Sequence, residues 1–205
     1  RSSDLEVRLE GRRVVVKAGS VEAILEFKLL KQSKAEYLTA NDVEQTLALY
    51  KSLKEVGVRV EITPKGVKVD SEAVWTLVVV AVERSPPSAL PAEVMPGVEL
   101  LKEYGAGGLK MYVLRVSEEG IHYYFAVKTE DGLRVAGGKL SGGVVRIAGK
   151  ATPIIADAIN TIYREMGMER RVKVKLHKDG TPYITLTNED LRLLGLTWRE
   201  RDRTN

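Results

Sequence analysis

One sextet of the first half, Leu53-Lys54-Glu55-Val56-Gly57-Val58, returns in altered form in the second half as Tyr163-Arg164-Glu165-Met166-Gly167-Met168. Each sextet ends a segment with helical apolar spacing, and each is followed by two short alternating segments around a turn glycine and then by another helix start. Internal similarity of this kind indicates a duplicated unit. The sequence therefore predicts an α+β protein of two pseudo-repeated halves, each an antiparallel strand meander, a helix, a β-hairpin and a short helix.

The first half is predicted to span residues 1–84. Alternating apolar residues predict strands at 5–10, 14–17 and 21–30. Asn41 and Glu44 have the spacing of a capping box, so a helix is expected from there to the C-cap glycine Gly57. A hairpin follows over 58–62 and 67–69, and Ser71 is expected to cap a last helix that runs toward Val82.

Prolines at 86, 87, 91 and 96 predict an extended linker over 85–97. The second half, 98–196, is expected to repeat the plan, with strands at 109–116, 121–128, 133–139 and 144–147, a helix from Thr152-Pro153 to Gly167, a hairpin over 172–176 and 183–186, and a closing helix capped by Asn188. Residues 197–205 form a charged tail that predicts a frayed end or a connection to a further domain.

The composition limits the chemistry that this protein can perform. There is no cysteine, which excludes disulfide frameworks, cysteine nucleophiles and thiolate metal sites, and there are only two histidines. Abundant ionic residues with few Asn and Gln are typical of a hyperthermophile, and no apolar stretch is long enough for a membrane span, so we expect a cytoplasmic protein. The net charge of +4 is compatible with a polyanionic partner.

The second predicted hairpin has the clearest electrostatic pattern. If Val172, Val174 and Leu176 face inward, the two-residue period of a strand sends the basic side chains between them to the opposite face. These side chains are Arg171, Lys173, Lys175 and His177, with Lys178 at the following turn. The pattern predicts phosphate contacts with nucleic acid, or alternatively only a solvated ionic face.

The first predicted hairpin is a weaker version of the same pattern. Arg59 lies on its first strand, with Lys65 at the turn and Lys68 on the returning strand. Two related hairpins with basic outer faces could straddle a duplex, with affinity coming from phosphate contacts rather than base contacts.

A stacking surface is also considered in the second meander. Tyr123 and Phe125 share a face with apolar neighbours and are expected in the core, which leaves Tyr124, beside Lys128, as the candidate exposed ring for single-stranded nucleic acid. The glycine-rich stretches 105–108 and 137–143 lack the spacing of a phosphate-binding loop, so we expect hairpin turns there.

Glu55 and Glu165 each precede a helix-ending glycine. Duplicated endonucleases of the LAGLIDADG type place metal-binding acids in such a position, and the chain resembles them only in Glu-Val-Gly57 and Glu-Met-Gly167. The motif lacks a second acid, and basic residues precede the glutamates where small packing residues are expected, so exposed glutamates near a C-cap glycine are the alternative. We therefore predict no catalytic residue, no metal and no cofactor, and keep an active or degenerate metal-dependent endonuclease as an alternative.

Several long runs resemble the PaRep paralogous repeat proteins of hyperthermophilic crenarchaea. The runs are Leu30-Lys31, 42–53, 60–70, 90–101, 121–129 and 186–195. The resemblance implies a cytoplasmic archaeal protein of a multicopy, mobile-element-associated set with a possible association with DNA, and it implies no catalytic residue.

The sequence thus predicts non-catalytic binding of DNA through basic sheet faces. A protein-interaction or self-association module is a second hypothesis, because Leu193, Leu194, Leu196 and Trp198 place apolar side chains near the end of the chain.

Overall fold

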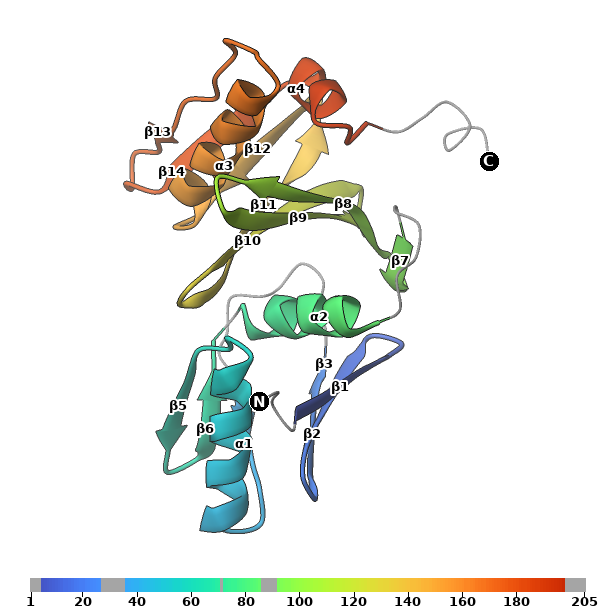
Figure 1. Ribbon diagram of the computed structural model, residues 1–205, viewed down its shortest axis with the longest axis vertical. Coiled ribbons are helices and arrows are strands. Elements are labelled where there is room, and N and C mark those ends of the chain that lie inside the picture. The colour runs from blue at the N-terminus through green and yellow to red at the C-terminus, as the bar shows by residue number, and fades with distance from the viewer. Residues whose placement is uncertain (1–4, 27–35, 71, 86–91, 198–205) are drawn as a thin grey trace. The chain divides into compact units, whose positions relative to one another are not determined.

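The computed structural model describes residues 5–26, 36–70, 72–85 and 92–197, and it divides into two compact units (Figure 1). The first unit holds the described residues of 1–89 together with 93–96 and 128–134, and the second holds those of 90–92, 97–127 and 135–205. Both units combine helices with antiparallel sheets, which confirms the α+β class.

The first unit begins with a three-stranded antiparallel meander. Its strands are β1 (Leu5–Glu10), β2 (Arg13–Ala18) and β3 (Val21–Glu26), in the order β1-β2-β3. Side chains of β3 alternate between buried and exposed, as expected for a strand with one covered face. The predicted strand 21–30 therefore reaches at least Glu26, and residues 27–30 lie outside the described residues.

A second sheet of the first unit contains the predicted hairpin. It is formed by β4 (Glu36–Leu38), β5 (Val60–Thr63) and β6 (Gly66–Val69), in the order β4-β6-β5. Two helices, α1 (Val43–Glu55) and α2 (Ala73–Arg84), complete the unit. The N-cap of α1 is Asp42 and not Asn41, because the Asp42 carboxylate accepts the Gln45 N–H at 2.8 Å.

The second unit is built on most of an eight-stranded antiparallel sheet, in the order β13-β14-β12-β11-β10-β9-β8-β7. The strands are β7 (Ala92–Met95), β8 (Val98–Ala106), β9 (Leu109–Ser117), β10 (Ile121–Thr129), β11 (Gly132–Ser141), β12 (Val144–Ala148), β13 (Lys175–Leu176) and β14 (Pro182–Leu186). Its helices are α3 (Thr152–Glu165) and α4 (Asn188–Leu193).

The core of the second unit lies between α3 and one face of the sheet. The apolar stripe of α3, including Ile155 and Ile159, packs with Tyr123 and Phe125 of β10, which are buried as predicted. Leu194 and Leu196 belong to the same core and are each 1% exposed. They are therefore not available as the apolar surface on which the self-association hypothesis depends, and Trp198 lies outside the described residues.

The repeated sextet has a local structural cause. In both copies the glycine has a positive φ, 94° at Gly57 and 76° at Gly167, and the next residue bonds back across the helix end. The bonds are Val58 N–H to Leu53 O (3.1 Å) and Met168 N–H to Tyr163 O (2.9 Å). The same bond closes α4, from Leu196 N–H to Leu191 O at 2.7 Å, with Gly195 at φ 74°. The sextet is thus a Schellman cap, with apolar residues at both ends of the bond.

The two halves share an order of elements but not a pairing of strands. The β5–β6 hairpin pairs with β4 in a sheet separate from the β1–β3 meander, whereas β14 pairs with β12 and so joins its own meander. The shared order of elements supports a duplication, whereas the different strand pairing of the two hairpins does not. The duplication therefore stays a prediction.

Two segments differ from the predicted boundaries. The expected linker 85–97 contains β7, because its prolines lie outside the strand and leave the Ala92–Met95 run free to pair. The turn 128–134, assigned from sequence to the second half, groups with the first unit. There Gly132 lies so close to Gly57 that an added Cβ would come within 2.2 Å of the Gly57 carbonyl oxygen.

The predicted glycine turns are confirmed at the two hairpin ends, where Gly107, Gly108, Gly142 and Gly143 all have positive φ. Gly137 and Gly138 differ, because both lie inside β11. Among the described residues, no helix is long and apolar enough to cross a membrane.

Candidate nucleic-acid interface

The basic segment between α3 and β14 is less regular than predicted. The expected strand 172–176 is reduced to the two residues of β13. Val172 is buried as predicted, but Val174 is 41% exposed and Leu176 68% exposed, so the prediction that both face inward is wrong. The segment before β13 therefore carries side chains into solvent on more than one side.

A buried asparagine on α3 explains the missing ladder. The Asn160 side chain accepts the Val172 N–H at 2.8 Å and donates to the Val172 carbonyl oxygen at 3.1 Å. This side-chain amide occupies the backbone groups of Val172 in the way that a neighbouring strand would. Asn160 thereby fixes the start of the basic segment against the helix.

A second anchor holds the segment at Arg170. Its Nε donates to the Asp190 carboxylate at 2.7 Å, and Tyr163 Oη donates to the same carboxylate at 2.6 Å. The other carboxylate oxygen accepts the Thr187 N–H at 2.9 Å. Burial would raise the pKa of Asp190, but hydrogen bonds from Arg170, Tyr163 and Thr187 outweigh it and hold that pKa below its ordinary value.

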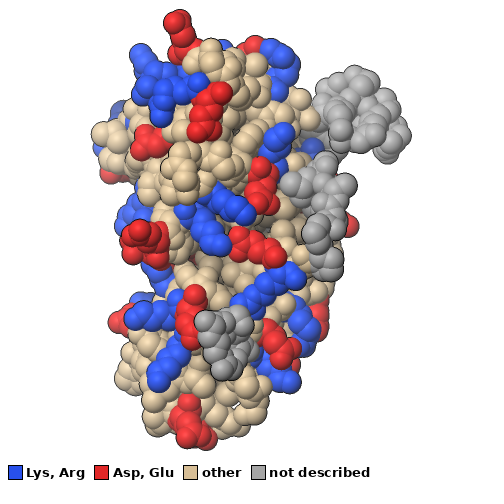
Figure 2. Space-filling model, in the orientation of Figure 1, with Lys and Arg blue, Asp and Glu red and all other residues tan. Residues whose placement is uncertain are grey.

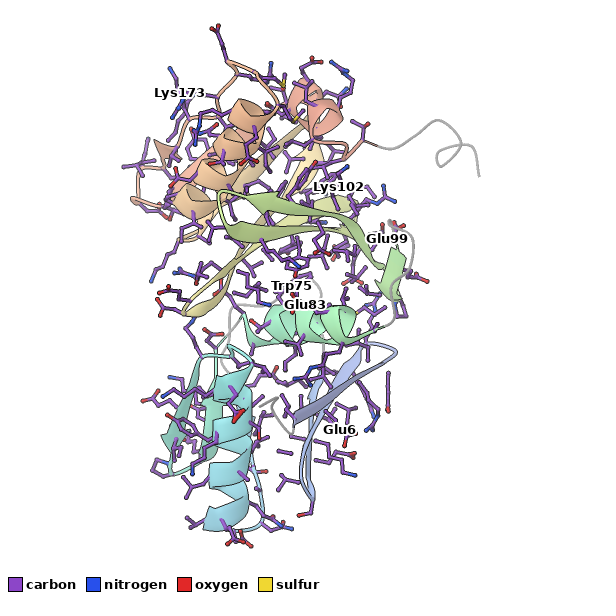
Figure 3. The ribbon with its side chains drawn as sticks, in the orientation of Figure 1. Glu6, Trp75, Glu83, Glu99, Lys102 and Lys173 are labelled. Carbon is purple, nitrogen blue, oxygen red and sulfur yellow. The ribbon has the colours of Figure 1, made fainter. Side chains whose placement is uncertain are left out.

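Four cations next to these anchors project into solvent. Arg171, Lys173, Lys175 and Lys178 are all exposed, and none forms a salt bridge with any residue that the structure describes. Figure 2 shows Lys and Arg side chains at the end of the second unit that carries β13, with Asp and Glu side chains among them, and Figure 3 shows Lys173 pointing away from the chain. The nearby carboxylate of Asp179 accepts the Thr181 N–H at 2.9 Å within its own turn.

His177 belongs to a small stacked group rather than to the free cations. Its ring is stacked on Tyr183 with centroids 4.2 Å apart and an interplanar angle of 20°. The guanidinium carbon of Arg146 lies 4.9 Å from the centroid of the same tyrosine ring. Three planar groups from β12, β14 and the turn after β13 therefore meet at one edge of the sheet.

Arg59, the predicted cation of the first hairpin, is already paired. Its Nε donates to Asp70 at 2.6 Å, and its guanidinium also donates to Glu72. A third contact reaches the Leu133 carbonyl oxygen at 3.5 Å. Arg59 is therefore half-buried and already paired with two carboxylates, and its contact with phosphate stays a prediction.

The remaining predicted cations of the first unit also have partners. Lys68 Nζ lies 4.0 Å from Glu61, its direct partner across the β5–β6 ladder, and Lys65 Nζ lies 5.5 Å from the ring centroid of Tyr37. Lys128 Nζ donates to both carboxylate oxygens of Glu83, at 2.9 and 3.0 Å, and Glu83 is labelled in Figure 3.

Tyr124 is half-buried and not the open ring expected from sequence. Its ring lies over Gly137, where an added Cβ would come within 2.5 Å of Tyr124 Cδ2. Burial raises the pKa of this tyrosine. The alternation rule placed Tyr124 correctly on the face opposite Tyr123, but that face is also partly covered.

The two glutamates of the endonuclease alternative are exposed at the ends of α1 and α3. In the part of the chain that the structure describes, no group of three or more His, Asp or Glu could hold a metal ion.

Arg146, Tyr183 and Asn160 are among the residues of this interface that were not predicted. Arg146 and Tyr183 lie on different strands, and only the register of β12 with β14 brings them together. Asn160 does have a sequence signal, since it is a polar residue within the apolar stretch of α3 and buried polar groups require partners.

No family model matches the chain, and neither a curated protein nor a solved structure matches it.

Proposed function

We propose that this protein binds nucleic acid without catalysis, through the basic segment Arg170–Lys178 of the second unit. The observation that supports the proposal is the set of exposed cations, Arg171, Lys173, Lys175 and Lys178, for which the described residues supply no carboxylate partner. DNA, an archaeal cytoplasmic setting and a mobile-element association belong to the same proposal.

Unpaired cations suit a phosphate backbone for a physical reason. Contact with phosphates releases condensed counterions, so each lysine or arginine that is free to make such a contact adds affinity that falls with salt concentration. A cation already paired with a carboxylate must first give up that partner. The segment is also held at Arg170 and Val172, which reduces the loss of conformational freedom on binding.

The proposal assigns no binding role to the first hairpin. Arg59 is neutralised by Asp70 and Glu72, and Lys68 and Lys128 face Glu61 and Glu83. Binding by two basic hairpins astride a duplex is therefore not part of the proposal.

The test is a charge reversal at Lys173→Glu/Lys175→Glu in the full chain. Fluorescence anisotropy with labelled oligonucleotides is measured over a range of salt concentrations. We expect affinity to fall at least about tenfold at low salt and the salt dependence to lose about one to two units of slope. Both residues are exposed, so the fold is expected to persist, which circular dichroism checks.

The matched control is Lys65→Glu/Lys68→Glu, which makes the same charge change in the first hairpin. We expect it to change affinity by less than about threefold, through long-range electrostatics alone. Equal losses in both variants, or no binding by the unaltered protein at micromolar concentration, would overturn the proposal.

A further inference from the structure

The face of the second unit's sheet opposite α3 remains open at the β12–β14–β13 edge. On the covered side Ile147 and Ile184 are buried in the core. Their neighbours along the strands, Arg146 and Thr185, are directly paired and exposed, so they lie on the opposite side. At this edge, one face of the sheet is therefore buried and the other is accessible to solvent.

The strand register places a tyrosine and a lysine side by side on the accessible face. Tyr183 pairs with Ala148 of β12 on one side and with Lys175 of β13 on the other. Directly opposed residues of antiparallel strands project to the same face, with Cβ atoms about 5 Å apart. An aromatic ring and one of the free cations are thus immediate neighbours.

Two other planar groups contact the Tyr183 ring. His177 lies 4.2 Å from it, nearly parallel, and the Arg146 guanidinium lies 4.9 Å from its centroid. A phenol ring, an imidazole and a guanidinium are all planar groups on which unpaired nucleobases stack. The turn fixes the backbone of His177, whose N–H donates to the Thr181 carbonyl oxygen at 2.9 Å and whose carbonyl oxygen accepts the Gly180 N–H at 2.9 Å.

The residues that follow Tyr183 across the neighbouring strands have small side chains or none. Ala148 is next to Tyr183, and Gly137 of β11 pairs with Ala148. Only a methyl group and a glycine follow Tyr183 along the sheet, until the ring of Tyr124 lies over Gly137. A flat base can therefore approach the group of His177, Tyr183 and Arg146 across this part of the sheet without meeting a bulky side chain of Ala148 or Gly137.

We propose that the Arg146–Tyr183–His177 stack binds the bases of single-stranded nucleic acid while Lys173 and Lys175 contact its phosphates. This inference rests on the proposed function and narrows its substrate to unpaired strands. The bases of a duplex are already stacked on each other and cannot lie on a ring at a sheet surface, whereas every base of a single strand has a free face for stacking.

The test compares a 20-nucleotide thymidine oligomer, the matching uridine oligomer and a 20-base-pair duplex by fluorescence anisotropy. For the unaltered protein we expect either single strand to bind at least about tenfold more tightly than the duplex. Tyr183→Leu keeps apolar bulk at a half-buried position and removes the ring that His177 and Arg146 both contact. We expect it to weaken single-strand binding about tenfold, with the salt dependence and the duplex affinity unchanged.

The matched control is Tyr37→Leu, since Tyr37 is an exposed tyrosine of the first unit with Lys65 near its ring. It is expected to leave single-strand affinity unchanged. Arg146→Gln, at an exposed strand position, gives a second variant with little risk to folding, and a loss of about threefold in single-strand affinity is expected.

The outcomes separate this inference from the proposed function. If duplex and single strand bind equally and Tyr183→Leu has no effect, while Lys173→Glu/Lys175→Glu still abolishes binding, the stacking inference is overturned and phosphate binding stands. If the charge reversal is without effect, the proposed function fails, and the inference fails with it. A loss in Tyr183→Leu that is confined to single strands supports the inference.

Discussion

The two hairpins occupy the same place in the order of elements, after a long helix and before a closing one, yet they use their charges in opposite ways. In β5–β6, Arg59, Lys65 and Lys68 each have a carboxylate or an aromatic partner. In the β13–β14 region, Lys173, Lys175 and Lys178 have no carboxylate partner among the described residues. The comparison shows that a basic strand becomes a candidate binding surface only when its cross-strand neighbours leave it unpaired.

The register of each hairpin accounts for the difference. The β5–β6 ladder runs over four residues of each strand and places Glu61 directly opposite Lys68. The β13–β14 ladder covers only two residue pairs and places Tyr183 and Pro182 opposite Lys175 and Leu176. An opposed acid gives a lysine a carboxylate partner, whereas an opposed tyrosine does not.

The largest effect is expected at the anchor of the second hairpin. Asp190→Ala removes the shared acceptor of Arg170, Tyr163 and Thr187, all within or beside the core. The loss of a buried charged partner is expected to destabilise the second unit by about 2–4 kcal/mol. Hydrogen exchange of the amides in 186–196 and urea unfolding measure this, with the exposed Glu189→Ala on the same helix as the control.

Protonation of Asp190 at low pH should reproduce part of the loss of stability that we expect for Asp190→Ala. Because the folded-state pKa of Asp190 is lowered, its contribution to stability is complete above the unfolded pKa of about 4 and is lost as the pH falls through the folded value. The stability difference between the unaltered protein and Asp190→Ala should therefore shrink below about pH 4. A difference that stays constant down to pH 2 would show that the Asp190 charge does not stabilise the fold.

A smaller effect is expected in the first hairpin. Arg59→Met removes the cation that Asp70 and Glu72 share, but Asp70 is only half-buried and open to water, and Glu72 keeps Arg134, whose Nε lies 3.8 Å from its carboxylate. We expect a loss of about 1 kcal/mol in the free energy of unfolding and no change in nucleic-acid affinity beyond about twofold. Binding that fell tenfold would show that Arg59 contacts nucleic acid after all, and would remove the distinction between the hairpins.

The sequence predicted the features of the two halves that depend on interactions between residues close together in the chain. Apolar periodicity located α1, α3 and most strands, and the helix-ending sextets reflect a cap that follows from Gly57 and Gly167. That cap recurs at Gly195, so similarity between the sextets has a cause that does not require duplication. The class of fold was accessible because it depends on pattern alone.

The candidate site was less predictable because it depends on partners distant in the chain. The Asn160 side chain accepts the N–H of Val172, which is 12 residues later in the chain. The Arg146 guanidinium of one strand lies over the Tyr183 ring of the neighbouring strand. Alternation treats 171–177 as a regular strand and so buries Val174 and Leu176 incorrectly. The register of the paired strands decides which cation faces a carboxylate. The pattern of charged residues in the sequence does not specify that register.

The smallest effect is expected from Glu61→Gln, which frees Lys68 without adding a cation. The pair is long, 4.0 Å, and both side chains are exposed, so stability should change by less than about 0.5 kcal/mol. One freed lysine beside the still paired Arg59 supplies a single phosphate contact, so we expect affinity for single-stranded oligomers to rise by no more than about twofold. Anisotropy at low salt, where such a contact is strongest, measures this. A tenfold rise would mean that Glu61 masks a second binding surface, and that the hairpins differ only in how easily their cations are released.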